Sequence, residues 1–304
     1  MEAKTLKGML IPLVTPLNSG YKVDVQGTQK LVDYVIAGGV NGLITSTRTG
    51  EMEYLERKEQ YRFCEAVVRH TAGRAPVIAG ITGKTEEETF KNLEYVQKLN
   101  PDFIFVAPLV YHSNKKLPEH LKKLAANSNL QILLYTNYEL ERRKPFKREN
   151  IRTELLKEIS GIEKIIGQKS SCDIERFQNY MQATRGTNFL HFIGNEGLIY
   201  EAFLLGAAGA VPSIGNIEPK LVEQLYDNFI DGDTGGAEEK QDRIIRMRNP
   251  YLQYGSVYVP AALKFVLSKM NICQDIAFVP LPKELPNLRN EILCTIGKLK
   301  AERE

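Results

Sequence analysis

The sequence predicts a (β/α)8 TIM barrel with a C-terminal helical extension, in the α/β class. Short apolar runs alternate with longer amphipathic stretches almost to the end of the chain, which is the order that a parallel barrel requires. Eight such runs follow one another at spacings of about 20–35 residues. The turn after the first run, Thr15 to Ser19, lacks the glycines typical of a doubly wound sheet. These observations favour a closed barrel over an open sheet.

Each of the eight apolar runs has the length and the flanking turns of a buried strand. The expected strands are Met9–Val14, Leu43–Thr45, Pro76–Gly80, Phe103–Val106, Gln131–Tyr135, Glu163–Lys169, Phe189–Gly194 and Gly209–Pro212. Helical spacing fills the intervals. It runs from Gln29 to Ala37 before Gly38-Gly39, and Thr85 with three following glutamates predicts a capped helix start.

The helical extension follows the eighth strand. We expect residues 1–218 to form the barrel and residues 219–304 to form helices packed on it, as a single structural unit. Glu218-Pro219 and the glycine-rich turn from Asp231 to Gly236 punctuate this part of the chain. No linker separates a second independent domain.

Composition narrows the function classes. The 304 residues carry 40 basic and 37 acidic side chains, a net charge of +3, which is too balanced to predict nucleic-acid or membrane-surface binding. No apolar run reaches the roughly 18 residues of a membrane helix, and the start of the chain lacks a signal-peptide core. Four cysteines and four histidines are scattered, which predicts free thiols in a reducing cytoplasm and no metal or cofactor.

A lysine and a tyrosine end two neighbouring predicted strands, Lys169 the sixth and Tyr135 the fifth. In a barrel of this kind the active site lies at the C-terminal ends of the strands. Desolvation lowers the pKa of a lysine there, so that its neutral amine attacks a ketone, and a tyrosine hydroxyl moves the protons. The pair predicts Schiff-base chemistry. The alternative is a strand-end lysine that reaches solvent.

The loop from Thr47 to Glu51 follows the second predicted strand and carries Gly50. Its backbone N–H groups, opening into a helix, would suit a carboxylate. An ordinary strand-to-helix turn is the other interpretation.

Several motifs in fixed order resemble the dihydrodipicolinate synthase / N-acetylneuraminate lyase family of Schiff-base class I aldolases. The matching segments span nearly the whole chain and are Val14-Thr15-Pro16, residues 47–51, residues 76–80, Leu134-Tyr135, residues 166–169, residues 206–211, residues 260–264 and residues 279–282. The resemblance implies that Lys169 forms a Schiff base with pyruvate or another 2-oxo acid. It implies proton transfer by Tyr135, and a substrate carboxylate on the amides of Arg48 and Thr49. It also implies a backbone carbonyl of Val211 near the lysine, and a homotetramer or homodimer.

Three further residues stand where the sialic-acid and sugar-acid lyases look similar. Ser171, Glu196 and Ser213 carry hydroxyl and carboxylate groups that would bind a polyol chain. The competing interpretation makes each a cap or turn residue, with Ser170-Ser171 capping the next helix.

The chain also departs from the family pattern. Arg48 replaces a small hydroxyl residue of the usual proton relay, but an arginine pairs bidentately with a carboxylate. The usual tyrosine after the fourth strand is missing, and Tyr111 is the nearest one. Leu140 stands where dihydrodipicolinate synthases place an arginine for the carboxylate of their aldehyde partner.

These features predict a lyase or aldolase that handles a 2-oxo acid and an aldehyde, with a 2-keto-3-deoxy sugar acid favoured over the lysine-biosynthetic reaction. Two alternatives remain open. One is a true dihydrodipicolinate synthase with an altered site. The other is a barrel that binds a 2-oxo acid as a sensor or scaffold without turnover.

Overall fold

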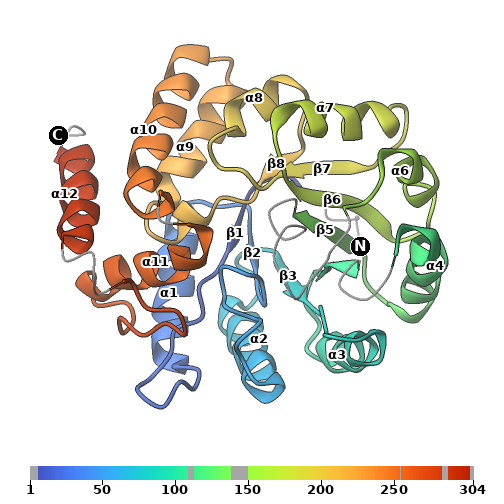
Figure 1. Cartoon of the computed structure of the whole chain (residues 1–304), viewed down its shortest axis with the longest axis horizontal. Helices are drawn as coiled ribbons and strands as arrows, with labels where there is room; N and C mark the ends of the chain where they lie inside the picture. The colour runs from blue at the N-terminus through green and yellow to red at the C-terminus, as the bar shows by residue number, and fades with distance from the viewer. Residues whose placement is uncertain (1–5, 109–112, 138–149, 254, 283–286, 302–304) are drawn as a thin grey trace.

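A closed barrel of eight parallel strands forms the centre of the molecule (Figure 1). The computed structural model describes residues 6–108, 113–137, 150–253, 255–282 and 287–301. The strands pair in chain order, and the last closes the barrel on the first. They are β1 Gly8–Pro12, β2 Gly42–Ile44, β3 Val77–Gly80, β4 Phe103–Val106, β5 Ile132–Asn137, β6 Ile165–Ser171, β7 Leu190–Ile193 and β8 Gly209–Ala210. The predicted fold class and all eight predicted strands are confirmed, with small shifts at their ends.

Helices surround the strands, as Figure 1 shows. Those that alternate with the strands are α1 Val25–Ala37, α2 Arg57–Thr71, α3 Glu86–Lys98, α4 Leu117–Asn127, α6 Thr153–Ile159, α7 Ile174–Ala183, α8 Ile199–Leu204 and α9 Pro219–Ile230. Short 3₁₀ turns, η2 Asn114–Lys116 and η3 Ser213–Asn216, precede α4 and α9.

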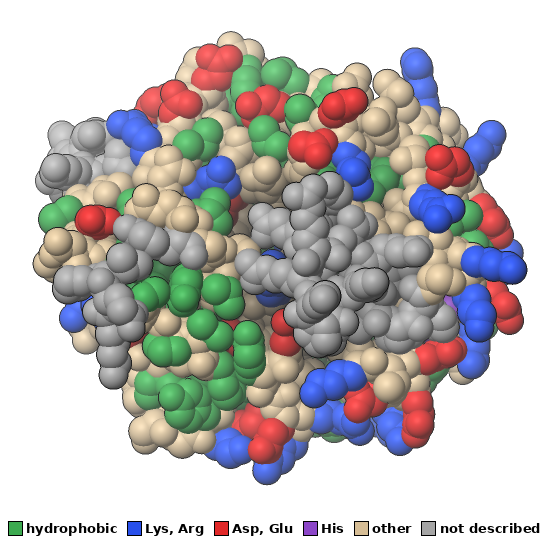
Figure 2. Space-filling model, viewed as in Figure 1, with side chains coloured by type: hydrophobic (Ala, Val, Ile, Leu, Met, Phe, Trp, Pro, Cys, Tyr) green, Lys and Arg blue, Asp and Glu red, His purple; other side chains and the backbone are tan. Residues whose placement is uncertain are grey.

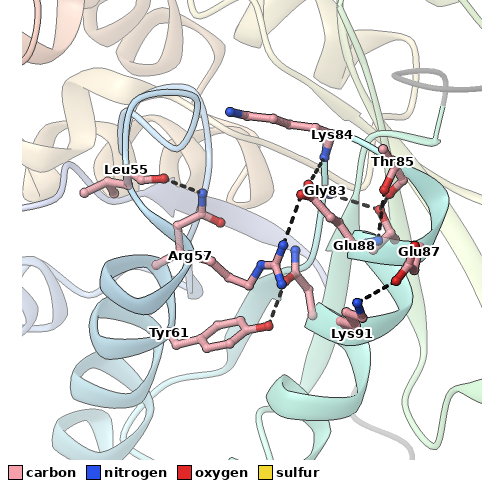
Figure 3. Close-up of polar contacts among 12 residues, drawn as sticks. Leu55, Arg57, Tyr61, Gly83, Lys84, Thr85, Glu87, Glu88 and Lys91 are labelled. Carbon is pink, nitrogen blue, oxygen red and sulfur yellow. Dashed lines mark hydrogen bonds and ion pairs between the residues drawn. The ribbon is translucent and has the colours of Figure 1, made fainter.

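The start of α3 shows how local sequence sets a helix boundary (Figure 3). Thr85 caps the helix by accepting a hydrogen bond of 3.2 Å from the Glu88 amide, as its sequence predicts. The Glu88 carboxylate accepts a 2.8 Å bond from the Lys84 amide and a 3.0 Å bond from Arg57 of α2. The same side chain therefore closes the turn and joins two neighbouring helices.

Apolar side chains form two layers. One fills the barrel interior and includes Leu10, Ile78, Phe105 and Phe192. The larger layer lies between the barrel and the surrounding helices. Successive strand residues face opposite sides, so a polar residue at the top of a strand points either into the barrel mouth or toward the helices.

The remaining helices gather along one side of the barrel, in orange to red in Figure 1. They are α10 Thr234–Leu252, η4 Ser256–Tyr258, α11 Val259–Lys269 and α12 Leu288–Ala301. The boundary expected at 218/219 falls just before α9, which packs on β1 and α1 and so completes the ring of barrel helices. We therefore place the start of the extension at α10.

Basic and acidic side chains are interspersed over the face drawn in Figure 2. This pattern agrees with the nearly balanced charge of the sequence. Among the described residues no helix is both long and apolar enough to cross a membrane.

Candidate active site

Lys169 lies on β6 with its side chain in the barrel mouth. It lines a cavity of about 500 Å³ together with Ser171, two residues further along the strand. The side chain is 7% exposed. Burial lowers its pKa to about 8; the nearby Glu196 carboxylate opposes that shift, and the Arg48 guanidinium adds to it. An amine with this pKa is partly neutral near pH 7 and can act as a nucleophile.

Tyr135 of β5 is the register partner of Lys169 across the β5–β6 pair. The Nζ atom of Lys169 is 4.8 Å from the centroid of the tyrosine ring. Asn137, two residues further along β5, donates a 2.7 Å hydrogen bond to the tyrosine hydroxyl. The sequence reasoning missed Asn137, although a period of two from Tyr135 would have placed it on the same face.

Gly194, just after β7, leaves the space that the lysine occupies. A Cβ atom at this position would lie 2.3 Å from the Ser171 hydroxyl and 2.7 Å from Cε of Lys169. Any larger residue would collide with Lys169, so the glycine at position 194 is part of the site.

The predicted substrate-binding residues line the same cavity as Lys169 and Tyr135. They are Arg48, Thr49, Ser171, Glu196, Val211 and Ser213. Tyr111 and Leu140 lie outside the described residues. A larger and more open depression contains Arg152 and Arg176 but neither Lys169 nor Tyr135, so we do not assign the chemistry to it.

The loop from Thr47 to Glu51 is closed by its own hydrogen bonds and does not run directly into a helix. Helix α2 begins only at Arg57. Within the loop the Gly50 amide donates to the Thr47 hydroxyl and the Glu51 amide donates to the Arg48 carbonyl. A helix dipole therefore does not act at this loop, and any carboxylate there would depend on the remaining amides and on the Arg48 side chain.

Arg48 is held toward the C-terminal extension. Its Nη2 atom donates a 3.0 Å hydrogen bond to the hydroxyl of Ser256 in η4. The guanidinium cannot serve as a proton relay near neutral pH. Its charge instead adds to the effect of burial, which is the main cause of the lowered pKa of Lys169.

Glu196, after β7, and Ser213, after the neighbouring β8, bond to each other at the mouth. The serine hydroxyl lies 3.2 Å from both carboxylate oxygens, and the Ile214 amide donates a 3.0 Å bond to one of them. The carboxylate thus secures the first turn of η3 while it faces the cavity.

Ser170 and Ser171 do not cap the following helix. Asp173 caps α7 by accepting a 2.8 Å bond from the Arg176 amide. Ser170 projects from the other face of β6, where its hydroxyl bonds to Thr136 at 3.2 Å. The capping interpretation is therefore wrong for this pair, and Ser171 is left facing the cavity.

One wall of the cavity comes from the C-terminal extension. Arg248 and Leu252 of α10 line it, with Ser256, Val259 and Pro260 from the following segment. The sequence reasoning did not single out Arg248, because nothing in the pattern of a charged amphipathic helix tells which arginine turns toward a distant strand.

A buried ion pair joins the extension to the loop after β2. Lys264 of α11 donates to the Glu51 carboxylate, and the Phe278 amide donates a 2.7 Å bond to the other carboxylate oxygen. Lys264 also donates to the Ile276 carbonyl at 2.9 Å. Both side chains are almost fully buried, and burial lowers the pKa of Lys264. This pair ties the loop that carries Arg48 and Thr49 to the extension.

A profile of the Dihydrodipicolinate synthetase family matches residues 5–287. The chain belongs to this family. It is therefore a lyase of the aldolase type, in a family whose members work through a Schiff base and act on pyruvate and aldehydes. No cluster of three or more metal-ligating side chains occurs among the described residues.

Relatives and solved structures agree with this membership. This chain is 29% identical to the 4-hydroxy-tetrahydrodipicolinate synthase of Cereibacter sphaeroides, over 91% of this chain and 92% of that protein. The dihydrodipicolinate synthase of Bacteroides thetaiotaomicron has a TM-score of 0.86 and 28% identity, with coverage of 96% and 98%. YagE of Escherichia coli K12, a prophage protein of the family in complex with pyruvate, has a TM-score of 0.87 at 21% identity, with coverage of 98% and 99%. The last similarity concerns the fold alone.

Proposed function

We propose that this protein forms a Schiff base between Lys169 and pyruvate or another 2-oxo acid, and uses it to make or break a bond to an aldehyde partner. The observation that carries the proposal is the placement of a buried lysine, with a pKa lowered to about 8, opposite Tyr135 at the barrel mouth. Pyruvate is also the ligand named for the YagE structure.

The proposed reaction begins when the neutral Lys169 amine attacks the ketone carbon of the 2-oxo acid. The amine loses a proton and the carbonyl oxygen gains one, which gives a carbinolamine. Protonation of its hydroxyl then releases water and leaves an iminium ion. Tyr135 is the group that moves these protons, with its hydroxyl oriented by Asn137. The iminium accepts the electron pair released when the carbon–carbon bond to the aldehyde fragment breaks.

The carboxylate of the 2-oxo acid is assigned to the Arg48 and Thr49 end of the cavity. Arg48 supplies a charge-assisted donor, and the Thr49 amide has no hydrogen-bond partner in the described part of the chain. The Val211 carbonyl, at the end of β8, is the proposed acceptor near the lysine, since Val211 lines the cavity beside it.

For the overall substrate we propose a 2-keto-3-deoxy sugar acid. Ser171 presents a hydroxyl to the cavity, and Glu196 with Ser213 presents a bonded polar pair. The curated relatives are instead named for the 4-hydroxy-tetrahydrodipicolinate synthase reaction, so aspartate semialdehyde belongs in any test of aldehyde partners.

A binding-only protein is the second candidate, and Arg48 favours it. An arginine in place of a hydroxyl relay preserves anion binding but weakens proton transfer.

We also propose that the protein assembles as a homotetramer or homodimer and works in a reducing cytoplasm. The compartment is supported by four free cysteines, Cys64, Cys172, Cys273 and Cys294.

The deciding experiment is borohydride reduction in the presence of pyruvate, followed by peptide mass spectrometry. We expect the reduced adduct on Lys169 and none on Lys164, which directly precedes β6 and donates to the Ala125 and Ser128 carbonyls. The absence of an adduct on Lys169 would refute the Schiff-base proposal. An adduct without turnover on a panel of 2-keto-3-deoxy acids and aldehydes would favour the binding protein.

A further inference from the structure

Arg248 places a second guanidinium in the wall of the Lys169 cavity. It projects from α10 toward the loop after β7, where Nη1 donates a 3.2 Å hydrogen bond to the Asn195 side chain. Asn195 accepts a second bond, also 3.2 Å, from the Gly197 amide of the same loop. The guanidinium is thus attached to the barrel mouth as well as to the extension.

The loop after β7 is shaped to admit this guanidinium. A Cβ atom on Gly197 would lie 2.5 Å from Nη2 and 2.8 Å from Cζ of Arg248. Only glycine leaves that space without displacement of the arginine. The close approach brings the guanidinium against the loop that also carries Glu196.

The charge of Arg248 is not neutralised within the described ranges. No Asp or Glu among them lies within ion-pair distance of its guanidinium. An arginine has five N–H donors, and the bond to Asn195 uses one of them. Its Nε atom is buried and has no hydrogen-bond partner in the same part of the chain.

The two acids of the cavity wall are already hydrogen-bonded to other groups. Glu196 accepts from Ser213 and Ile214, and Asp173 accepts from the Arg176 amide. The wall therefore presents Arg48, Lys169 and Arg248 against two carboxylates that other donors hold. This balance favours an anionic ligand.

The two arginines lie at different parts of the cavity wall. Arg48 follows β2, whereas Arg248 lies over the loop after β7, three places away around the closed barrel. A single carboxylate at the Arg48 and Thr49 end leaves Arg248 unoccupied. A ligand that satisfies both arginines has an anionic group at each end, with the reacting carbon between them.

We propose that Arg248 binds a second anionic group, a carboxylate or a phosphate, at the far end of the aldehyde partner. The guanidinium fork matches both groups in bidentate geometry. The inference rests on the proposed Schiff-base function and sharpens it, because the overall substrate becomes a 2-keto-3-deoxy acid with acidic groups at both ends.

Matched aldehydes test the proposal in condensation with pyruvate. The phosphate arm compares glyceraldehyde 3-phosphate with glyceraldehyde, and the carboxylate arm compares succinic semialdehyde with butanal. We expect kcat/KM to favour the anionic member by about tenfold or more in at least one arm. The arm that shows the preference identifies the anionic group.

Three variants assign the preference to Arg248. Arg248→Gln should lower kcat/KM for the preferred anionic aldehyde by about 10- to 100-fold and leave the neutral one within about twofold. Arg248→Lys should recover part of the loss, since it restores charge without the fork. Arg246→Gln, an exposed position on the same helix, should change neither value. The KM for pyruvate and the borohydride adduct on Lys169 should persist in all three.

The outcomes separate this inference from the proposed function. Loss of the pyruvate adduct in the unaltered protein would refute the Schiff-base proposal itself. Three other results would overturn the Arg248 assignment while the adduct persists. They are that no aldehyde condenses with pyruvate, that the anionic aldehyde is not preferred, or that Arg248→Gln lowers activity with neutral and anionic aldehydes alike.

Discussion

Lys169 lies directly opposite Tyr135 across the β5–β6 pair, with its Nζ atom 4.8 Å from the centre of the tyrosine ring. Because the strands are parallel and in register, both side chains emerge on the same face at the same height. The nucleophile and the proposed proton carrier are thus positioned by backbone pairing rather than by a mobile loop.

Removal of the tyrosine hydroxyl should slow adduct formation. We expect Tyr135→Phe to reduce the rate of the borohydride-trapped pyruvate adduct by about 10²- to 10⁴-fold, because carbinolamine formation and dehydration lose their proton carrier. Lys169→Ala should abolish the adduct. Tyr95→Phe, a half-buried position far along α3 where Tyr95 stacks on Tyr61 of α2, is the matched control. An unchanged rate in Tyr135→Phe would remove Tyr135 from the mechanism.

The rate of adduct formation should depend on pH through Lys169. Only the neutral amine attacks, and the pKa of this lysine is about 8. The rate at saturating pyruvate should therefore fall about tenfold per pH unit well below pH 8 and level off above it.

Two charge-removing variants should move this profile in opposite directions. The Glu196 charge raises the pKa of Lys169 and the Arg48 charge lowers it. Glu196→Gln should thus shift the midpoint to lower pH, whereas Arg48→Thr should shift it to higher pH. Shifts in the same direction would contradict the assigned electrostatics, even if both variants lose activity.

A methyl group at position 194 should block the nucleophile. The Cβ atom of Gly194→Ala would fall 2.7 Å from Cε of Lys169 and 2.3 Å from the Ser171 hydroxyl. We expect the pyruvate adduct to fall by at least about tenfold while circular dichroism still shows a folded barrel. Gly297→Ala on α12, where a Cβ meets nothing within 4 Å, provides the control. Normal adduct formation in Gly194→Ala would mean that the lysine adopts another position for reaction.

The buried Lys264–Glu51 pair should contribute to both stability and substrate binding. Lys264→Met leaves the Glu51 carboxylate buried without its counterion, which should lower the free energy of unfolding by about 3–5 kcal/mol. Loosening of the loop that carries Arg48 and Thr49 should also raise the KM for pyruvate. Denaturant unfolding and steady-state kinetics measure the two effects.

Two controls separate the buried charge from lost packing. The double variant Glu51→Gln with Lys264→Met should lose less stability than Lys264→Met alone, because no unpaired charge remains. Lys22→Met removes one side of the exposed Lys22–Glu56 pair and should cost no more than about 1 kcal/mol. Equal losses in the single and double variants would argue against a role for the charge.

Most of the fold could be predicted from the sequence because its signals are local. Eight apolar runs bounded by turns identified the strands, and the Thr85 cap identified the start of α3. The hydrogen bonds by which the loop from Thr47 to Glu51 closes on itself, before α2 begins at Arg57, could not be predicted. Hydrogen bonds of this kind depend on backbone conformation, which residue type does not specify.

The sequence by itself determined the barrel and the two residues at the ends of neighbouring strands, Lys169 and Tyr135. Strand order and the period of two are enough to bring such residues to one mouth. Only the tertiary structure decided that Arg248 reaches the same mouth from the extension and that Lys264 pairs with Glu51 of the loop after β2. The physical reason is that α10 carries several arginines, and its sequence does not say which of them faces a distant loop. Long-range packing decides this, together with local space such as that left by Gly197 for the Arg248 guanidinium.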